Sequence, residues 1–199
     1  TSTESQTTPN QSLKNALRTA RYDGSGKVKL AKIATKPEHD VTKEEMLAKL
    51  VPMREELSEL EAKLHAEGKR GLLIVFQALD AAGKDGTVRD VFSGMNPQGV
   101  VVHAFKQPSS EERVHDYLWR IHQAAPARGM IRVVNRSDYE DAAAGSVEKL
   151  APAADWNKRC GQINDFARRP TQDGIVVLHV LLNHSQARQR PGCDNAPSN

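Results

Sequence analysis

A lysine within a run of small residues is the part of this sequence best suited to chemistry. Lys84 lies in the segment Ala78-Leu-Asp-Ala-Ala-Gly-Lys-Asp-Gly-Thr87, which follows an apolar run over residues 72–76. Small residues let backbone N–H groups approach an oxyanion closely, and the lysine adds a point charge. The pattern predicts a strand, a phosphate-binding loop and the first turn of a helix. The residues expected to hold the phosphate are Ala82, Gly83, Lys84, Asp85, Gly86 and Thr87.

The loop differs from the strict G-x-x-x-x-G-K-[ST] pattern at two positions. Ala78 stands first, and Asp85 stands where a metal-binding hydroxyl is expected, so an ordinary strand-to-helix turn is the alternative interpretation. Asp80 is also unusual, because a carboxylate beside phosphate is repelled unless a cation lies between them. Asp80 therefore indicates Mg²⁺ held jointly by the protein and the phosphate oxygens.

A second polar segment, Asn-Arg-Ser-Asp-Tyr-Glu-Asp over residues 135–141, follows the apolar run over residues 131–134. Ligands of open α/β sheets bind at the carboxyl ends of strands, so we expect this segment and the lysine loop to face one crevice. Arg136 can neutralise a transferred phosphoryl group, while Asp141 or Glu140 can hold a metal or orient the acceptor. The alternative is a helix start whose acidic residues stabilise its first turn.

Lys106 is a third candidate, because it follows an apolar run over residues 100–105 and so lies at the carboxyl end of a strand. The helix expected after it, over residues 109–122, has two faces of interest. Its core face is expected to hold Val114, Leu118 and Ile121. Its second face holds His115, Trp119 and His122. The second face could form a ligand wall, but packing and surface exposure are the more ordinary roles.

Another helix is expected to begin at Thr42, because Thr42-Lys-Glu-Glu45 has the spacing of a capping box. Pro52 fits a first-turn position, and Gly68 is a typical helix end. An apolar stripe between them is expected to pack against the sheet or against another subunit. The stripe consists of Met53, Leu57, Leu60 and Leu64.

The elements that must position these side chains alternate between strands and helices. Strands are expected over residues 72–76, 100–105, 130–134 and 175–182, the first three buried on both faces. Helices are expected over residues 84–93, 109–122 and 155–168. This order predicts a three-layer α/β/α domain with a central parallel sheet and an N-terminal helical extension. The predicted limits are a flexible arm over residues 1–40, a core over residues 41–185 and an irregular tail over residues 186–199.

The composition fits one globular domain, because 38% of the 199 residues are hydrophobic and 27% are charged. No apolar run approaches the roughly 20 residues that span a bilayer. The net charge of +3 is mild and by itself says little about a partner, although it permits a polyanion. We expect neither a nucleic-acid nor a membrane partner. Cys160 and Cys193 lack metal-ligand spacing and are expected to be free thiols, which favours the cytoplasm.

Five segments, in order, resemble the second family of polyphosphate kinases. They are Asp-Ala-Ala-Gly-Lys-Asp-Gly-Thr (80–87), Asn-Pro-Gln-Gly (96–99), Phe-Lys-Gln-Pro-Ser (105–109), His-Asp-Tyr-Leu-Trp-Arg-Ile-His (115–122) and Asn-Arg-Ser-Asp-Tyr-Glu-Asp (135–141). The resemblance is good over residues 40–142 and looser over residues 156–182. It implies a P-loop kinase core, Mg²⁺, phosphoryl transfer between inorganic polyphosphate and AMP or ADP, and a possible homo-oligomer.

Position by position, the resemblance also implies roles for individual residues. The implied catalytic residues are Asp80, Lys84, Arg136 and Asp141. Asp80 and Asp141 would serve the metal and the acceptor phosphate. The implied polyphosphate ligands beyond the loop are Lys106, Asn135 and Arg136.

Two departures from the family pattern bear on turnover. Ala-Ala-Ala-Gly-Ser over residues 142–146 replaces an apolar, arginine-bearing segment, and no arginine-rich lid follows His184-Ser185. A lid excludes water from the reacting phosphates, so its loss is expected to impair turnover more than phosphate binding. Two rival interpretations are an ATP-dependent nucleotide or small-molecule kinase of the same fold, and a non-catalytic polyphosphate-binding remnant.

Overall fold

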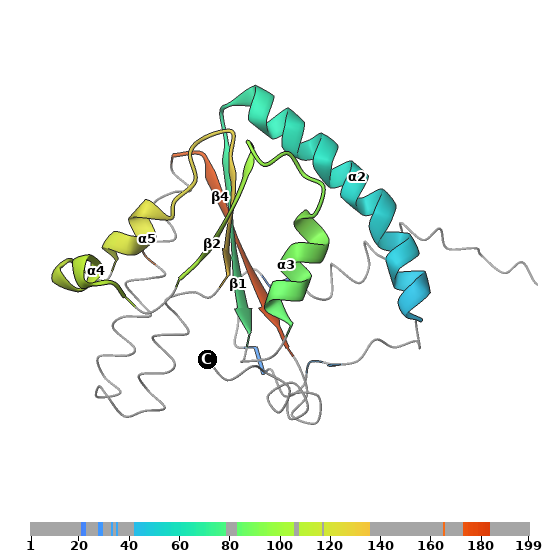
Figure 1. Cartoon of the computed structure of the whole chain (residues 1–199), viewed down its shortest axis with the longest axis horizontal. Helices are drawn as coiled ribbons and strands as arrows, with labels where there is room; N and C mark the ends of the chain where they lie inside the picture. The colour runs from blue at the N-terminus through green and yellow to red at the C-terminus, as the bar shows by residue number, and fades with distance from the viewer. Residues whose placement is uncertain are drawn as a thin grey trace, which may run out of the picture. The chain divides into compact units, whose positions relative to one another are not determined.

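The computed structural model (Figure 1) describes 21–22, 28–29, 33, 35, 42–78, 83–105, 108–116, 118–135, 165 and 173–183. The chain divides into two compact units, Thr1–Ala34 and Thr35–Asn199, and every helix and strand named below belongs to the second. The arm predicted over residues 1–40, the helix predicted over residues 155–168 and the tail over residues 186–199 lie almost wholly outside the described residues. Both cysteines also lie outside them, so these four expectations remain predictions.

The second unit is built on a four-stranded parallel sheet. Its strands are β1 (Gly71–Ala78), β2 (Val100–Ala104), β3 (Ile131–Asn135) and β4 (Ile175–Leu182). Their order across the sheet is β2-β3-β1-β4, and all three pairings are parallel. The register places Phe76 of β1 opposite Asn135 of β3. The predicted parallel sheet is confirmed, with each strand close to its expected range.

The longest helix, α2 (Lys43–Glu67), begins and ends at the predicted residues. Thr42 Oγ1 accepts from the Glu45 backbone N–H at 3.2 Å, and Glu45 Oε2 accepts from the Thr42 backbone N–H at 3.0 Å. Gly68 ends the helix with φ 60°, a left-handed conformation that favours glycine. No helix in the described part of the chain is long and apolar enough to cross a bilayer.

The first-turn position predicted for Pro52 is wrong, because Pro52 lies inside α2. Proline has no N–H to donate to the carbonyl four residues earlier, which usually ends or kinks a helix. Here α2 continues through Pro52, and the strong cap at Thr42 sets the helix start instead.

Helices cover both faces of the sheet, as the three-layer prediction requires (Figure 1). On one face, side chains of α2 and α3 (Lys84–Phe92) pack on the strands. The core of that face includes Leu64, Ile74, Phe76, Val88, Phe92 and Val133. The core of the opposite face includes Leu73, Val75, Phe105, Ala124 and Val134. Helix α5 (Trp119–Gln123) ends directly before Ala124, and it therefore covers this opposite face of the sheet.

Strand β2 is not buried on both faces, which corrects the prediction for its apolar run. It lies at one edge of the sheet, and Val102 is 50% exposed. The inner strands β1 and β3 are the ones that are largely buried. An apolar run therefore predicted the strand correctly, but it could not distinguish an inner strand from an edge strand.

The single helix predicted over residues 109–122 is two short helices, α4 (Ser110–Val114) and α5. Ser109 caps α4 as a capping box, but His115 is extended and ends it. The backbone N–H of Trp119 then donates to the carbonyl of Asp116 at 2.8 Å and closes a turn. Because of this break, Val114 is 80% exposed and is not part of a core face.

The apolar stripe of α2 also differs from its prediction. Leu64 packs against the core, but Met53, Leu57 and Leu60 are exposed. Among the described residues, therefore, the stripe does not pack against this chain's own sheet along most of its length.

Candidate functional site

The lysine loop and the segment that begins at Asn135 leave neighbouring strands at the same edge of the sheet. From β1 the chain runs through α3 to β2 at one edge of the sheet, and from β3 it runs past β1 to β4 at the other. Connections that leave two adjacent parallel strands in opposite directions open a crevice at the strands' carboxyl ends. The topology thus places the candidate site between the carboxyl ends of β1 and β3.

Lys84 lies at this crevice with its side chain buried. Its Nζ donates a hydrogen bond to the carbonyl oxygen of Ala78, the last residue of β1, at 2.8 Å. This bond connects the first residue of α3 to the end of β1 across the intervening loop. A buried ammonium favours an anionic ligand, because charge that is removed from water is stabilised by opposite charge.

The start of α3 has the geometry of an anion site. Gly83 precedes the helix with φ 77° and ψ 22°, a left-handed conformation in which a side chain would be strained. The Thr87 backbone N–H and Oγ1 both donate to the Gly83 carbonyl, at 2.9 and 3.0 Å. The N–H groups of Lys84, Asp85 and Gly86 precede this bond, so the helix itself offers them no acceptor. Such N–H groups, at the positive end of a helix dipole, bind phosphate.

Asn135 connects β3 to the same helix start. It is buried, and its Nδ2 donates to Asp85 Oδ1. The carboxylate of Asp85 therefore faces an amide, and only its backbone N–H suits the phosphate contact predicted for this residue. Sequence reasoning placed Asn135 and Asp85 near one crevice but did not foresee their hydrogen bond.

The buried oxygen of Asn135 is relevant to a metal. Asn135 Oδ1 has no hydrogen-bond partner among the residues that the structure describes. It is an amide oxygen beside the Asp85 carboxylate, and oxygen donors of this kind suit Mg²⁺ or its bound water. Within the described ranges, no three His, Cys, Asp or Glu side chains form a group that could hold a metal.

The remaining predicted site residues lie outside the described residues. These are Asp80, Ala82, Lys106, Arg136, Glu140 and Asp141. The structure therefore brings together Gly83, Lys84, Asp85, Gly86, Thr87 and Asn135. The roles of the other six remain predictions.

A cationic and aromatic cluster lies where β2 ends. Arg120 is buried, with its guanidinium carbon 4.4 Å from the centroid of the Phe105 ring. His103 packs edge-to-face on the same ring, at a centroid distance of 4.7 Å. Burial, and then the positive charges of Arg132 and Arg120, lower the pKa of His103 below its ordinary value. The cluster holds Phe105, the residue directly before Lys106, in a fixed position.

Sequence reasoning did not assign a role to Arg120, because helical periodicity identifies apolar core residues and not a cation that packs on a ring.

The second face expected on the helix over residues 109–122, with His115, Trp119 and His122, is seen in part. His115 and Trp119 stack, with ring centroids 4.3 Å apart and planes inclined by 18°. This contact spans the break between α4 and α5, so it arises from a turn and not from one helical face.

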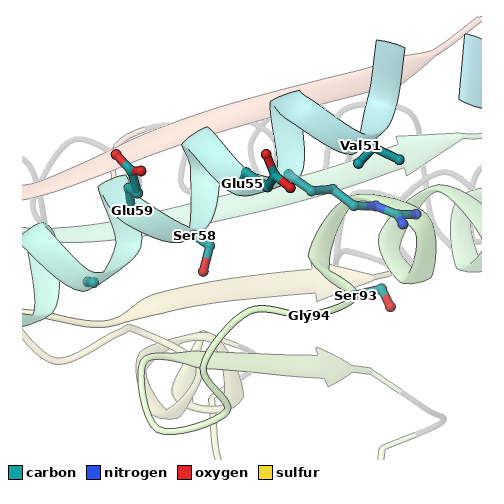
Figure 2. Close-up of a pocket in the computed structure, with 8 residues that line it drawn as sticks. Val51, Glu55, Ser58, Glu59, Ser93 and Gly94 are labelled. Atoms are coloured by element: carbon teal, nitrogen blue, oxygen red, sulfur yellow. The ribbon is translucent and has the colours of Figure 1, made fainter. Parts of the chain in front are cut away.

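A surface groove of about 650 Å³ lies elsewhere, between α2 and the turn that follows α3 (Figure 2). Its lining includes Val51, Glu55, Ser58, Glu59, Ser93 and Gly94. The groove is at the end of α3 opposite to Lys84, and it contains none of the predicted phosphate ligands. Arg54 also lines it, but two glutamates outnumber this one cation, so the groove is poorly suited to an anion and is not the phosphate site.

Comparison with known proteins agrees with this arrangement. The sequence profile of the polyphosphate kinase 2 (PPK2) family matches residues 40–193. The AMP/ADP-polyphosphate phosphotransferase of Meiothermus ruber is 42% identical over 148 residues, which are 74% of this chain and 55% of the relative. The ADP-polyphosphate phosphotransferase of Rhodopseudomonas palustris is 38% identical over 148 residues, with coverages of 68% and 51%.

A solved structure is similar over most of the chain. The crystal structure of polyphosphate kinase 2 from Arthrobacter aurescens superposes with a TM-score of 0.79 at 40% identity, covering 87% of this chain and 64% of that one. The chain spans about half the length of the two curated relatives. The profile match, the relatives and the shared fold agree, and the chain belongs to the polyphosphate kinase 2 family.

Proposed function

We propose that this chain transfers a phosphoryl group between inorganic polyphosphate and AMP or ADP. The observation that carries the proposal is the buried ammonium of Lys84, held at the carboxyl end of β1 beside the N-terminus of α3. The relatives support the substrate class, since they are named AMP/ADP-polyphosphate and ADP-polyphosphate phosphotransferases.

The residues of the site suit phosphoryl transfer because this reaction needs alignment and charge neutralisation more than a covalent catalyst. Lys84 and the N–H groups of the first turn of α3 bind phosphate oxygens. Asn135 holds that turn against β3 through Asp85. Arg136 directly follows Asn135, and with Lys106 it pairs with polyphosphate oxygens.

Mg²⁺ is the proposed cofactor, held by Asp80 and Asp141. Once bound, it neutralises charge on the phosphate oxygens and aligns them for in-line transfer. The buried Asn135 Oδ1 and the Asp85 carboxylate supply further oxygen atoms at the same crevice, which supports a divalent cation there. We place the protein in the cytoplasm, where free thiols at Cys160 and Cys193 would persist.

The test compares phosphoryl donors. The purified chain is incubated with AMP or with ADP, together with polyphosphate or with ATP, in the presence of Mg²⁺ or of a chelator. We expect ADP or ATP to form from polyphosphate only when Mg²⁺ is present. Transfer from ATP without any response to polyphosphate would instead identify an ATP-dependent kinase. Salt-sensitive polyphosphate binding without transfer would identify a non-catalytic binding module.

A further inference from the structure

Arg120 is a buried cation to which the proposed transfer reaction gives no role. Only 6% of the residue is exposed, and its guanidinium carbon lies 4.4 Å from the centroid of the Phe105 ring. Removing a guanidinium from water is costly, and an apolar side chain would fill the same space without that cost. The ring offsets only part of the cost. Packing alone therefore does not explain why an arginine is at this position.

The ring under Arg120 marks the end of the edge strand. Phe105 directly follows β2, is 7% exposed, and belongs to the core of the sheet face that α5 covers. His103, two residues earlier, packs edge-to-face on the ring at a centroid distance of 4.7 Å. Arg120 covers the ring from α5. These contacts together fix the point at which the chain leaves β2.

The segment that follows Phe105 is anchored at its other end as well. Arg113 Nε donates to the carbonyl of Pro108 at 3.1 Å, and α4 begins directly afterwards with its capping box. Only residues 106–107 separate Phe105 from Pro108. Because consecutive Cα atoms are about 3.8 Å apart, two residues cannot extend far from these anchors. The position of Lys106, which directly follows Phe105, therefore depends on where that ring is held.

Arg120 acts on both ends of this short connection. It covers the Phe105 ring at one end. At the other end, the pKa of Glu112 is lowered first by the hydrogen bond from the Ser109 backbone N–H and then by the charge of Arg120. We propose that Arg120 is a positioning residue that, through Phe105, sets where Lys106 meets polyphosphate. The inference rests on the proposed function, in which Lys106 pairs with polyphosphate oxygens.

A positioning arginine and a merely structural one differ in what their loss affects. Loss of a structural arginine lowers the stability of the fold but leaves the folded protein with its ordinary affinity for polyphosphate. Loss of a positioning arginine misplaces Lys106, so the affinity for polyphosphate falls while the KM for AMP or ADP stays the same. The two roles are therefore separated by comparing the two substrates in protein that is shown to be folded.

The first experiment replaces Arg120 with methionine, which is of similar length but uncharged. The Kd for inorganic polyphosphate of one defined chain length is measured by calorimetry, and KM and kcat by product formation. Arg120→Met should raise both the Kd and the KM for polyphosphate roughly tenfold. Arg89→Met is the matched control, because it makes the same change at an exposed side chain of α3, and it should keep the wild-type values. A folded Arg120→Met protein with the wild-type Kd would overturn the proposal.

A double-variant cycle tests the route of the effect. Lys106→Met should itself weaken polyphosphate binding. If Arg120 acts through Lys106, adding Arg120→Met to Lys106→Met should weaken binding no further. Losses that multiply in the double variant would show that Arg120 acts by another route, and would also overturn the proposal.

Arg120→Lys provides the same test if Arg120→Met does not fold, because lysine keeps a cation that can lie over the ring. Its loss of affinity should be smaller and should again disappear in the Lys106→Met background. Binding is measured without turnover, so the two proposals fail separately. A wild-type chain that binds polyphosphate with this coupling but forms no product would refute the proposed function alone. An active wild-type chain without the coupling would refute the role of Arg120 alone.

Discussion

The side-chain amide of Asn135 donates a hydrogen bond to the carboxylate of Asp85, which joins the last residue of β3 to the first turn of α3. The two residues are 50 positions apart in sequence and meet between the carboxyl ends of β1 and β3. The reverse orientation of the amide would place its oxygen against a carboxylate and would be repulsive. The contact therefore holds the first turn of α3 against β3 and sets the orientation of the buried Asn135 oxygen.

Asn135→Asp should destabilise the protein near neutral pH by about 1–3 kcal/mol, because it replaces a charge-assisted hydrogen bond with two adjacent carboxylates. Repulsion raises the pKa of the introduced carboxyl above its unfolded value of about 4. The destabilisation is then complete above the raised folded pKa, decreases as the pH falls through that pKa, and is absent below the unfolded value. Urea unfolding at neutral and acid pH measures both effects.

The control for this variant exchanges the two groups. The double variant Asn135→Asp with Asp85→Asn re-forms an amide–carboxylate pair and should recover most of the stability at neutral pH. If both variants are equally unstable, the hydrogen bond is not the source of the effect.

Glu61 provides a test of the interior beneath α2. Neither of its carboxyl oxygens has a hydrogen-bond partner in the described part of the chain, although the side chain is fully buried. Glu61→Met keeps the volume and removes the polar atoms, so the free energy of unfolding should rise by about 1–4 kcal/mol. Thermal unfolding measures the change, and a lower midpoint would show that the carboxyl group is stabilising.

Gly99 limits what fits beside Glu61, because a Cβ at this position would overlap the Glu61 carboxylate. Gly99→Ala alone should therefore destabilise the protein. Combined with Glu61→Ala, which removes the obstructing carboxylate, the same change should cost much less than the sum of the two single effects. Strict additivity would contradict the contact.

His103 should make stability depend on pH. Its pKa in the folded protein is lowered by burial and by Arg132 and Arg120, so the unfolded chain binds the proton more readily. Stability is therefore complete above the unfolded pKa of about 6.5 and is lost as the pH falls through the folded pKa. His103→Gln should show a smaller drop in melting temperature on acidification from neutral pH. An unchanged drop would assign the acid sensitivity to other groups.

Local signals in the sequence predicted much of the fold. The capping box at Thr42 and the glycine at 68 fixed the ends of α2, and the apolar runs located the four strands. The lysine loop and the segment that begins at Asn135 were expected at one crevice, because a parallel sheet brings the carboxyl ends of its strands to one edge.

Contacts between distant residues could not be read from the sequence. Apolar runs do not reveal that β2 is an edge strand, and periodicity alone did not show the turn that separates α4 from α5. The burial of Arg120 on Phe105 and the bond between Asn135 and Asp85 depend on tertiary packing, which no local pattern encodes.

The most direct test of the central claim is the rate of polyphosphate-dependent ADP formation from AMP, or of ATP formation from ADP, in two lysine variants. Lys84→Ala removes the buried ammonium and should lower the rate by about 100-fold or more. Lys69→Ala, at an exposed position just after α2, should keep the wild-type rate. A folded Lys84→Ala protein that forms product as fast as Lys69→Ala would contradict the role of the loop.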